Sequence, residues 1–108
     1  MPEDDLTQQA QALLDLVAYQ DGSVVSRTLL KESAGTVTLF AFDAGQSLSE
    51  HTTPHNALVQ VLDGEFEITL AGELKRVAKG QVLLMPAGQP HALVAEVPST
   101  MLLTMIRG

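Results

Sequence analysis

From residue 23 onward, apolar residues recur at about every second position, which is the period of a half-buried β-strand. Segment 65–70 alternates most cleanly, and Phe66, Ile68 and Leu70 are predicted to face a core. Segment 36–42 is apolar on both faces, which is typical of a strand in the centre of a sheet or at a subunit contact. Strands are predicted over residues 24–30, 36–42, 57–62, 65–70, 73–77, 82–85, 91–97 and 101–106. Turn signals such as Asp63-Gly64 separate these strands, so an all-β barrel or sandwich is predicted.

The first 22 residues follow a different pattern. Apolar residues with the spacing of one helical face are Leu6, Ala10, Leu13, Leu14 and Val17. A proline and three acids at residues 2–5 suit the positive end of such a helix. Because residues 14–19 suit extended chain equally well, the segment is predicted to be helical or irregular. The chain is therefore divided into an N-terminal segment at 1–22, packing on the barrel or on a dimer partner, and a barrel at 23–108.

The composition limits the possible functions. The chain has no cysteine, which excludes disulfides and thiolate metal sites. The net charge is −7 with only six Lys and Arg, and these are not clustered, so nucleic acid is not an expected partner. No apolar run approaches the roughly 20 residues that span a bilayer, and the acidic N-terminus is unlike a secretory signal. A cytoplasmic protein with no membrane partner is predicted.

The candidate chemistry lies in two stretches, Gly45–Gly64 and Gly80–His91, which hold all three histidines of the chain, His51, His55 and His91. Outside them we find no strand-turn-helix setting for a nucleophilic serine, no paired carboxylates and no glycine-rich phosphate loop. The glycines occur singly, and Gly64, Gly80 and Gly88 are predicted to be turn residues with positive φ.

The two stretches resemble the paired signature motifs of the cupin family. Members of this family are small jelly-roll barrels. The matching positions are Gly45, His51 and Gly64 in the first motif and Gly80, Pro86, Gly88 and His91 in the second. The resemblance covers residues 35 to about 105. It implies an all-β jelly-roll β-barrel of the compact, single-domain cupin 2 type, preceded by the short N-terminal segment.

The departures from the motifs concern the metal ligands that the resemblance implies. Thr53 stands where the family has a second histidine, and Ala57 stands where it has a glutamate. Of the implied ligands, only His51 and His91 carry over. His55, in the loop-like segment TTPHN, completes a three-nitrogen site if that loop folds inward, and otherwise it is a solvent-facing loop residue.

An apolar pocket for a small organic molecule is also predicted. Its lining is drawn from Phe40, Phe42, Val59, Val61, Met85, Leu93, Leu103 and Met105. One interpretation is a metal-binding cupin with Fe, Mn, Ni or Zn at His51, His55 and His91, dioxygenase- or isomerase-like by resemblance. The alternative is a metal-free module that binds or senses a small ligand. Whether the protein is an enzyme stays open at this point.

A homodimer is predicted as well. A barrel this small has exposed strand edges, which another chain can cover. The apolar segment 13–30 is the candidate for covering a partner's sheet.

Overall fold

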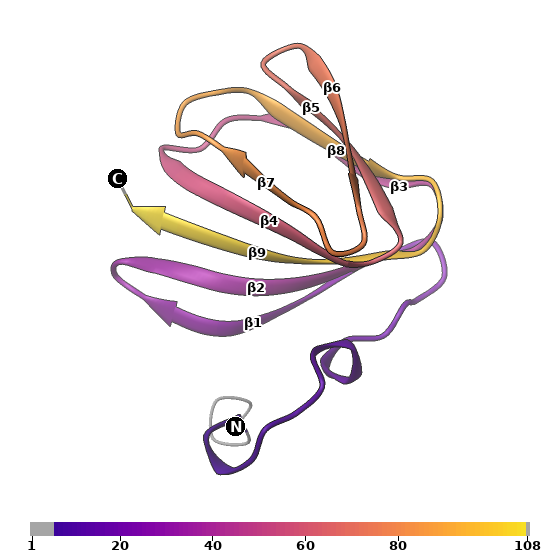
Figure 1. Ribbon diagram of the computed structural model, residues 1–108, viewed down its shortest axis with the longest axis vertical. Helices are drawn as coiled ribbons and strands as arrows, with labels where there is room; N and C mark the ends of the chain where they lie inside the picture. Colours follow the sequence, from indigo (N-terminus) through magenta and orange to yellow (C-terminus); the bar gives the residue numbers. More distant parts are fainter. Residues whose placement is uncertain (1–5, 108) are drawn as a thin grey trace.

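The chain forms two antiparallel sheets that face each other across one apolar core (Figure 1). The computed structural model describes residues 6–107. The strands within them are β1 Val24–Glu32, β2 Gly35–Phe42, β3 Gln46–His51, β4 His55–Asp63, β5 Glu65–Leu70, β6 Glu73–Ala78, β7 Val82–Met85, β8 His91–Ala95 and β9 Ser99–Arg107. Sheet A has the order β1-β2-β9-β4-β7 and sheet B the order β3-β8-β5-β6. The predicted all-β jelly-roll barrel is confirmed, and no helix among residues 6–107 is long and apolar enough to cross a membrane.

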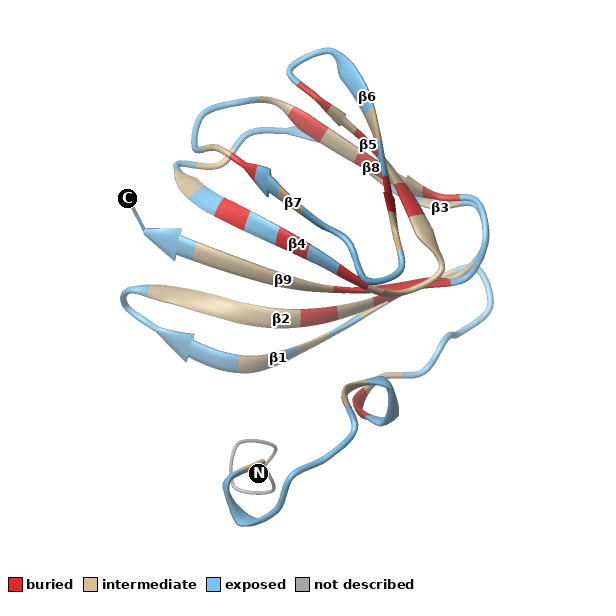
Figure 2. Ribbon diagram, viewed as in Figure 1, coloured by how far each residue is buried: buried red, intermediate tan, exposed pale blue. Residues whose placement is uncertain are grey.

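The core lies between the inner faces of the two sheets (Figure 2). On β4, the buried residues Ala57, Val59 and Val61 alternate with exposed ones. On β5, Phe66 is fully enclosed, as the alternation predicts. Its ring meets the ring of Phe42 edge-on, with 5.0 Å between the centroids. This contact joins sheet B to sheet A near the end of the barrel where β2 ends and β9 begins.

Gly64 shows why the turns of this barrel require glycine. Its φ is 72°, in the left-handed region that side chains disfavour. A Cβ at this position would also collide with the side chain of Ser99 and the carbonyl oxygen of Pro98. Gly80 and Gly88 have positive φ as well, so the turn role predicted for these three glycines is confirmed.

The first part of the stretch Gly45–Gly64 differs from the prediction in two ways. Residues 46–51, which carry no strand signal, form β3 at the edge of sheet B, where they pair only with β8. Its residues are half-buried or exposed, so the apolar alternation that marks the other strands is missing. The loop expected around His55 is shorter than predicted, because β4 begins at His55, which pairs with Arg107. His55 shares a face with Ala57 and therefore lies on the inner side of sheet A.

The N-terminal segment packs on the outer face of sheet A in the same chain. A continuous helix does not form: residues 6–8 are helical, and a separate 3₁₀ helix covers Leu13–Leu16. The predicted acidic first turn at 2–5 lies outside the described residues. Leu16 is buried, and its carbonyl oxygen accepts a hydrogen bond from Arg27 Nη1 at 3.2 Å. This hydrogen bond ties Leu16 to β1 of its own chain, and covering of a partner's sheet by segment 13–30 stays a prediction.

Tyr19 fastens this segment to the barrel. Its hydroxyl donates a hydrogen bond to Asp63 Oδ2 at 2.8 Å and accepts one from Thr100 Oγ1 at 2.8 Å. Thr100 is 2 % exposed, so water cannot readily replace Tyr19 as its acceptor. The hydroxyl pair therefore ties the N-terminal segment to β9.

Replacing Tyr19 by Phe should lower the free energy of unfolding by about 1–2 kcal/mol, because the buried Thr100 hydroxyl loses its acceptor. Unfolding in urea measures the change. Thr100→Val removes that hydroxyl, so the double variant should lose less stability than the sum of the two single variants. Strictly additive losses would show that the two side chains do not interact.

The same contact predicts a pH dependence. Burial raises the pKa of Tyr19 above its ordinary value of 10.0, because it disfavours the charged phenolate, and the neighbouring Asp63 adds to the increase. A raised folded-state pKa contributes stability that is complete below pH 10 and is lost as the pH rises through the folded-state value. Stability should therefore fall more steeply above pH 10 in the wild type than in Tyr19→Phe. Equal slopes in the two proteins would contradict this assignment.

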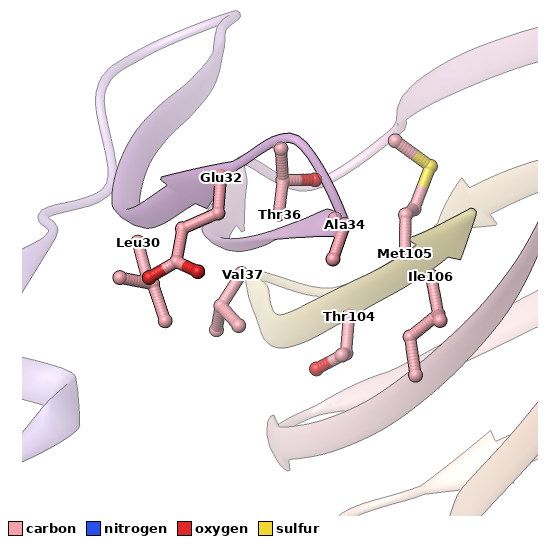
Figure 3. A pocket seen from close by; sticks show the side chains of 9 residues that line it. Leu30, Glu32, Ala34, Thr36, Val37, Thr104, Met105 and Ile106 are labelled. Carbon is pink, nitrogen blue, oxygen red and sulfur yellow. The ribbon is translucent and has the colours of Figure 1, made fainter.

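The outer face of sheet A also carries exposed apolar residues, among polar ones such as Asn56 and Gln60. One cross-strand row passes over all five strands, through Leu30, Val37, Thr104, Leu58 and Leu84. Leu58 is 42 % exposed and Leu84 is 55 % exposed. Beside them, a hollow of about 270 Å³ is lined by Leu30, Val37, Thr104 and Ile106, among other residues (Figure 3). This face therefore carries an apolar ridge, formed by the exposed Leu58 and Leu84, and a separate hollow lined by Leu30 and Val37.

We propose that a second copy of the chain covers this face, which gives the predicted homodimer its interface. Two copies of one twisted sheet can pack face to face about a two-fold axis, so the ridge of each copy can enter the hollow of the other. Leu84→Lys should then convert the dimer into a species of 11.5 kDa, measured by light scattering during size-exclusion chromatography. Leu74→Lys, at an exposed leucine on sheet B, is the control and should leave the dimer intact. A wild-type mass of 11.5 kDa would contradict the proposal.

Candidate functional site

His51 and His91 face each other across one pair of strands. His51 is the last residue of β3, His91 is the first residue of β8, and the two are partners in the strand register. Both lie at the end of the barrel where β4 begins and β9 ends, which we call the mouth (Figure 1). The loop before His91 is held across the mouth by a hydrogen bond from Gly88 N to the carbonyl oxygen of Thr53, at 2.8 Å.

The two imidazole rings are in direct contact. Their Nε2 atoms are 3.1 Å apart, and the ring centroids are 4.3 Å apart with 66° between the ring planes. His91 is only 3 % exposed, whereas His51 is exposed to solvent. The pair therefore has one ring fixed in the barrel and one ring open to an arriving molecule.

Backbone carbonyl groups determine which nitrogen of each ring is protonated. Nδ1 of His51 lies 2.8 Å from the carbonyl oxygen of Ser49, and Nδ1 of His91 lies 3.2 Å from that of Gln89. A carbonyl oxygen can only accept, so we assign a proton to both Nδ1 atoms. In neutral rings both Nε2 atoms then present lone pairs to each other at 3.1 Å. This contact is repulsive unless a second proton or a cation lies between the nitrogens.

The pair meets two tests of a metal site. Adjacent imidazole ligands at about 2.1 Å from an ion lie about 3.0 Å apart when they subtend a right angle, which agrees with the observed 3.1 Å. Metal-binding histidines also donate the proton of their other nitrogen to a carbonyl or carboxylate group, and both rings do so. Among residues 6–107, however, no group of three or more His, Asp or Glu side chains is arranged to hold a metal ion.

The structure does not bring His55 to this pair. It lies on sheet A, and its neighbours in a pocket at the mouth include Lys31, Thr36 and Arg107. Its Nδ1 is enclosed and has no hydrogen-bond partner among the described residues. The three-histidine site therefore stays a prediction, which a loop movement or a ring rotation would have to complete.

The two departures from the family motifs have clear structural consequences. Thr53 accepts a hydrogen bond from the backbone N of His55 through its hydroxyl, at 3.2 Å. Ala57 is 1 % exposed and packs in the core. Neither residue supplies the imidazole or carboxylate that the family resemblance implies for its position.

The residues of the predicted pocket lie at two depths. Five of them are at most 4 % exposed and fill the closed core: Phe42, Val59, Val61, Met85 and Leu93. The other three are partly buried and pack against that core: Phe40, Leu103 and Met105. Of the eight, Met105 reaches the pocket at the mouth. The lining of a substrate pocket by this set stays a prediction.

Sequence reasoning missed two contributors to the site. The carbonyl groups of Ser49 and Gln89 orient the rings, and each belongs to the residue two places before its histidine. A backbone group carries no signal in residue type. Lys31 and Arg107 beside His55 were also missed, although pairing of the chain's β1, β2 and β9 segments would have placed them on one face.

Together these observations define a single-domain jelly-roll barrel with a histidine pair at its mouth. The chain belongs to the cupin family, since the model of the cupin domain matches residues 38–107. The matched range includes all three histidines.

Three similar proteins come from bacteria. An uncharacterised protein of Streptomyces coelicolor is 34 % identical over 74 residues, which cover 68 % of this chain and 69 % of that protein. A crystal structure of a protein of unknown function from Streptococcus pyogenes is 38 % identical, with a TM-score of 0.88, covering 93 % of this chain and 88 % of that one. A cupin superfamily protein from Desulfitobacterium hafniense is 26 % identical, with a TM-score of 0.89 and coverage of 94 % and 93 %.

Proposed function

We propose that this protein is a metal-binding cupin in which His51 and His91 hold one divalent cation, and in which a small organic molecule binds beside that cation. The observation that carries the proposal is the pair of Nε2 atoms 3.1 Å apart, each on a ring whose Nδ1 is committed to a carbonyl oxygen. A cation removes the repulsion between the two lone pairs and satisfies both nitrogens at once.

The two rings play different parts in this proposal. His91 is buried and aligned by Gln89, so it holds a fixed position. His51 is exposed, so the side of the site that it forms is open to water and to a ligand. Two imidazoles leave most coordination positions to these molecules, and the nitrogen ligands suit Fe, Mn, Ni or Zn. A bound metal of this kind polarises a carbonyl group or activates water or oxygen, which makes isomerase and dioxygenase assays the first to perform.

The alternative function is a metal-free module that binds or senses a small ligand. The side chains at Thr53 and Ala57 favour it, because neither provides a metal ligand. In that case one ring carries a second proton, and the histidine pair shares a hydrogen bond that a polar group of the ligand can join.

Metal binding separates the two functions. At a metal concentration one hundred times the dissociation constant, binding should raise the free energy of unfolding by about 2.7 kcal/mol. Thermal unfolding with each of Mn, Fe(II), Ni and Zn, together with calorimetric titration, measures this effect. His51→Ala should abolish it with little change in the stability of the metal-free protein, because His51 is exposed.

His55→Ala is the matched control for the ligand set. Metal binding that survives this change would assign the metal to His51 and His91 alone, and binding that is lost would support the three-histidine site. If the wild type binds none of the four metals, the metal-binding function is excluded and the ligand-binding module remains.

A further inference from the structure

The sheet A side of the mouth carries a second polar site, which the histidine pair does not use. His55 and Arg107 are direct partners on β4 and β9, and Lys31 and Thr36 are partners in the adjacent row. Together with Ser33, these side chains line a pocket of about 150 Å³. Lys31, Arg107, His55 and the two hydroxyl groups all offer hydrogen-bond donors, and Glu32 is the carboxylate among the lining residues.

The charge of this pocket is opposite to that of the protein. The chain has a net charge of −7 and six Lys and Arg, two of which are here. Arg76 is paired with Glu65 and Glu67, but within residues 6–107 no ion pair involves Lys31 or Arg107. The pocket therefore has two cations against the one carboxylate of Glu32, and its net positive charge in an otherwise acidic molecule favours the approach of an anion.

His55 gives the second, independent indication of a ligand. Its Nδ1 is enclosed and unpartnered, although buried polar atoms are nearly always hydrogen-bonded. The protein groups among residues 6–107 leave this nitrogen unsatisfied. Because it is enclosed, a rotation of the imidazole is needed before a molecule or a water in the pocket can pair with it.

We propose that this pocket binds the carboxylate of a small organic acid. A guanidinium group and an ammonium group that line one pocket suit a carboxylate, which Arg can hold with two parallel hydrogen bonds. The volume of 150 Å³ corresponds to about five water molecules, enough for a carboxylate and a few carbon atoms. A doubly charged phosphate is a poorer fit, because Glu32 and the net charge of −7 repel it more strongly.

The position of the pocket suggests how such an acid would lie. Four residue steps join His51 to His55, so their Cα atoms are at most about 14 Å apart. An acid anchored at Arg107 and Lys31 contacts the histidine pair if its carbon chain spans this separation. This last step rests on the proposed metal site, whereas recognition of the carboxylate does not.

Butyrate is a suitable probe, with butyramide as its uncharged twin at the same ionic strength. In the full-length, chelator-treated protein, butyrate should give saturable NMR shifts at His55 and Arg107, and butyramide should not. Arg107→Met and Lys31→Met should each weaken binding by about tenfold or more, the loss expected for one charge-assisted hydrogen bond. Lys79→Met is the control. It removes one charge from the exposed turn between β6 and β7, which does not line the pocket, and should leave binding unchanged.

Three outcomes would overturn the inference. These are equal shifts with butyramide, unchanged affinity in both methionine variants, and binding of inorganic phosphate as tight as that of butyrate. Butyrate binding is also measured in His51→Ala, which lacks a proposed metal ligand and keeps the lining of this pocket. If the metal proposal fails, butyrate binding should persist, and if the carboxylate site fails, metal binding to the histidine pair should persist.

Discussion

The structure depends on the burial of one face of each sheet against the other. The edge-on contact between Phe42 and Phe66 is part of this interface, and the alternation of buried and less buried residues along β4 and β5 follows from the same burial. Because side chains alternate along a strand, one buried residue sets the direction of all the others. Burial of Ala57 and Val59 thus turns His55 towards the barrel interior, and it turns Leu58 towards the solvent. The polar pocket and the apolar outer face are consequences of the same core.

The histidine pair lies where packing against the core constrains the side chains least. β3 is an edge strand whose residues are exposed or half-buried, so packing alone does not orient His51. Hydrogen bonds orient the rings instead, because each ring is held by a carbonyl oxygen two residues earlier in its own strand or loop. An orientation set by local backbone is compatible with an exposed site, which a molecule from solvent has to reach. The site can therefore be both defined and open.

The fold could be predicted from the sequence because its signals are local. Alternation in 65–70 and turns at Gly64 and Gly80 follow from residue type and were confirmed. β3 gave no signal because it buries no continuous face, and the N-terminal segment did not form one helix because its Leu16 is held by sheet A instead. That His51 and His91 lie close together was predicted through the motif resemblance. The protonation of the two rings was not, since it depends on carbonyl groups that no residue pattern reveals.

The mouth of the barrel joins two kinds of chemistry from two different sheets. Sheet B contributes the histidine pair, and sheet A contributes His55 and Arg107 with the ammonium group of Lys31 beside them. Only residues 52–54 separate β3 from β4, and the carbonyl of Thr53 in this link is bonded to the loop that leads to His91. The short link and this hydrogen bond therefore keep the two sites at the same end of the barrel. In such an arrangement, a ligand that contacts both sides gains affinity from a preformed geometry rather than from ordering the protein as it binds.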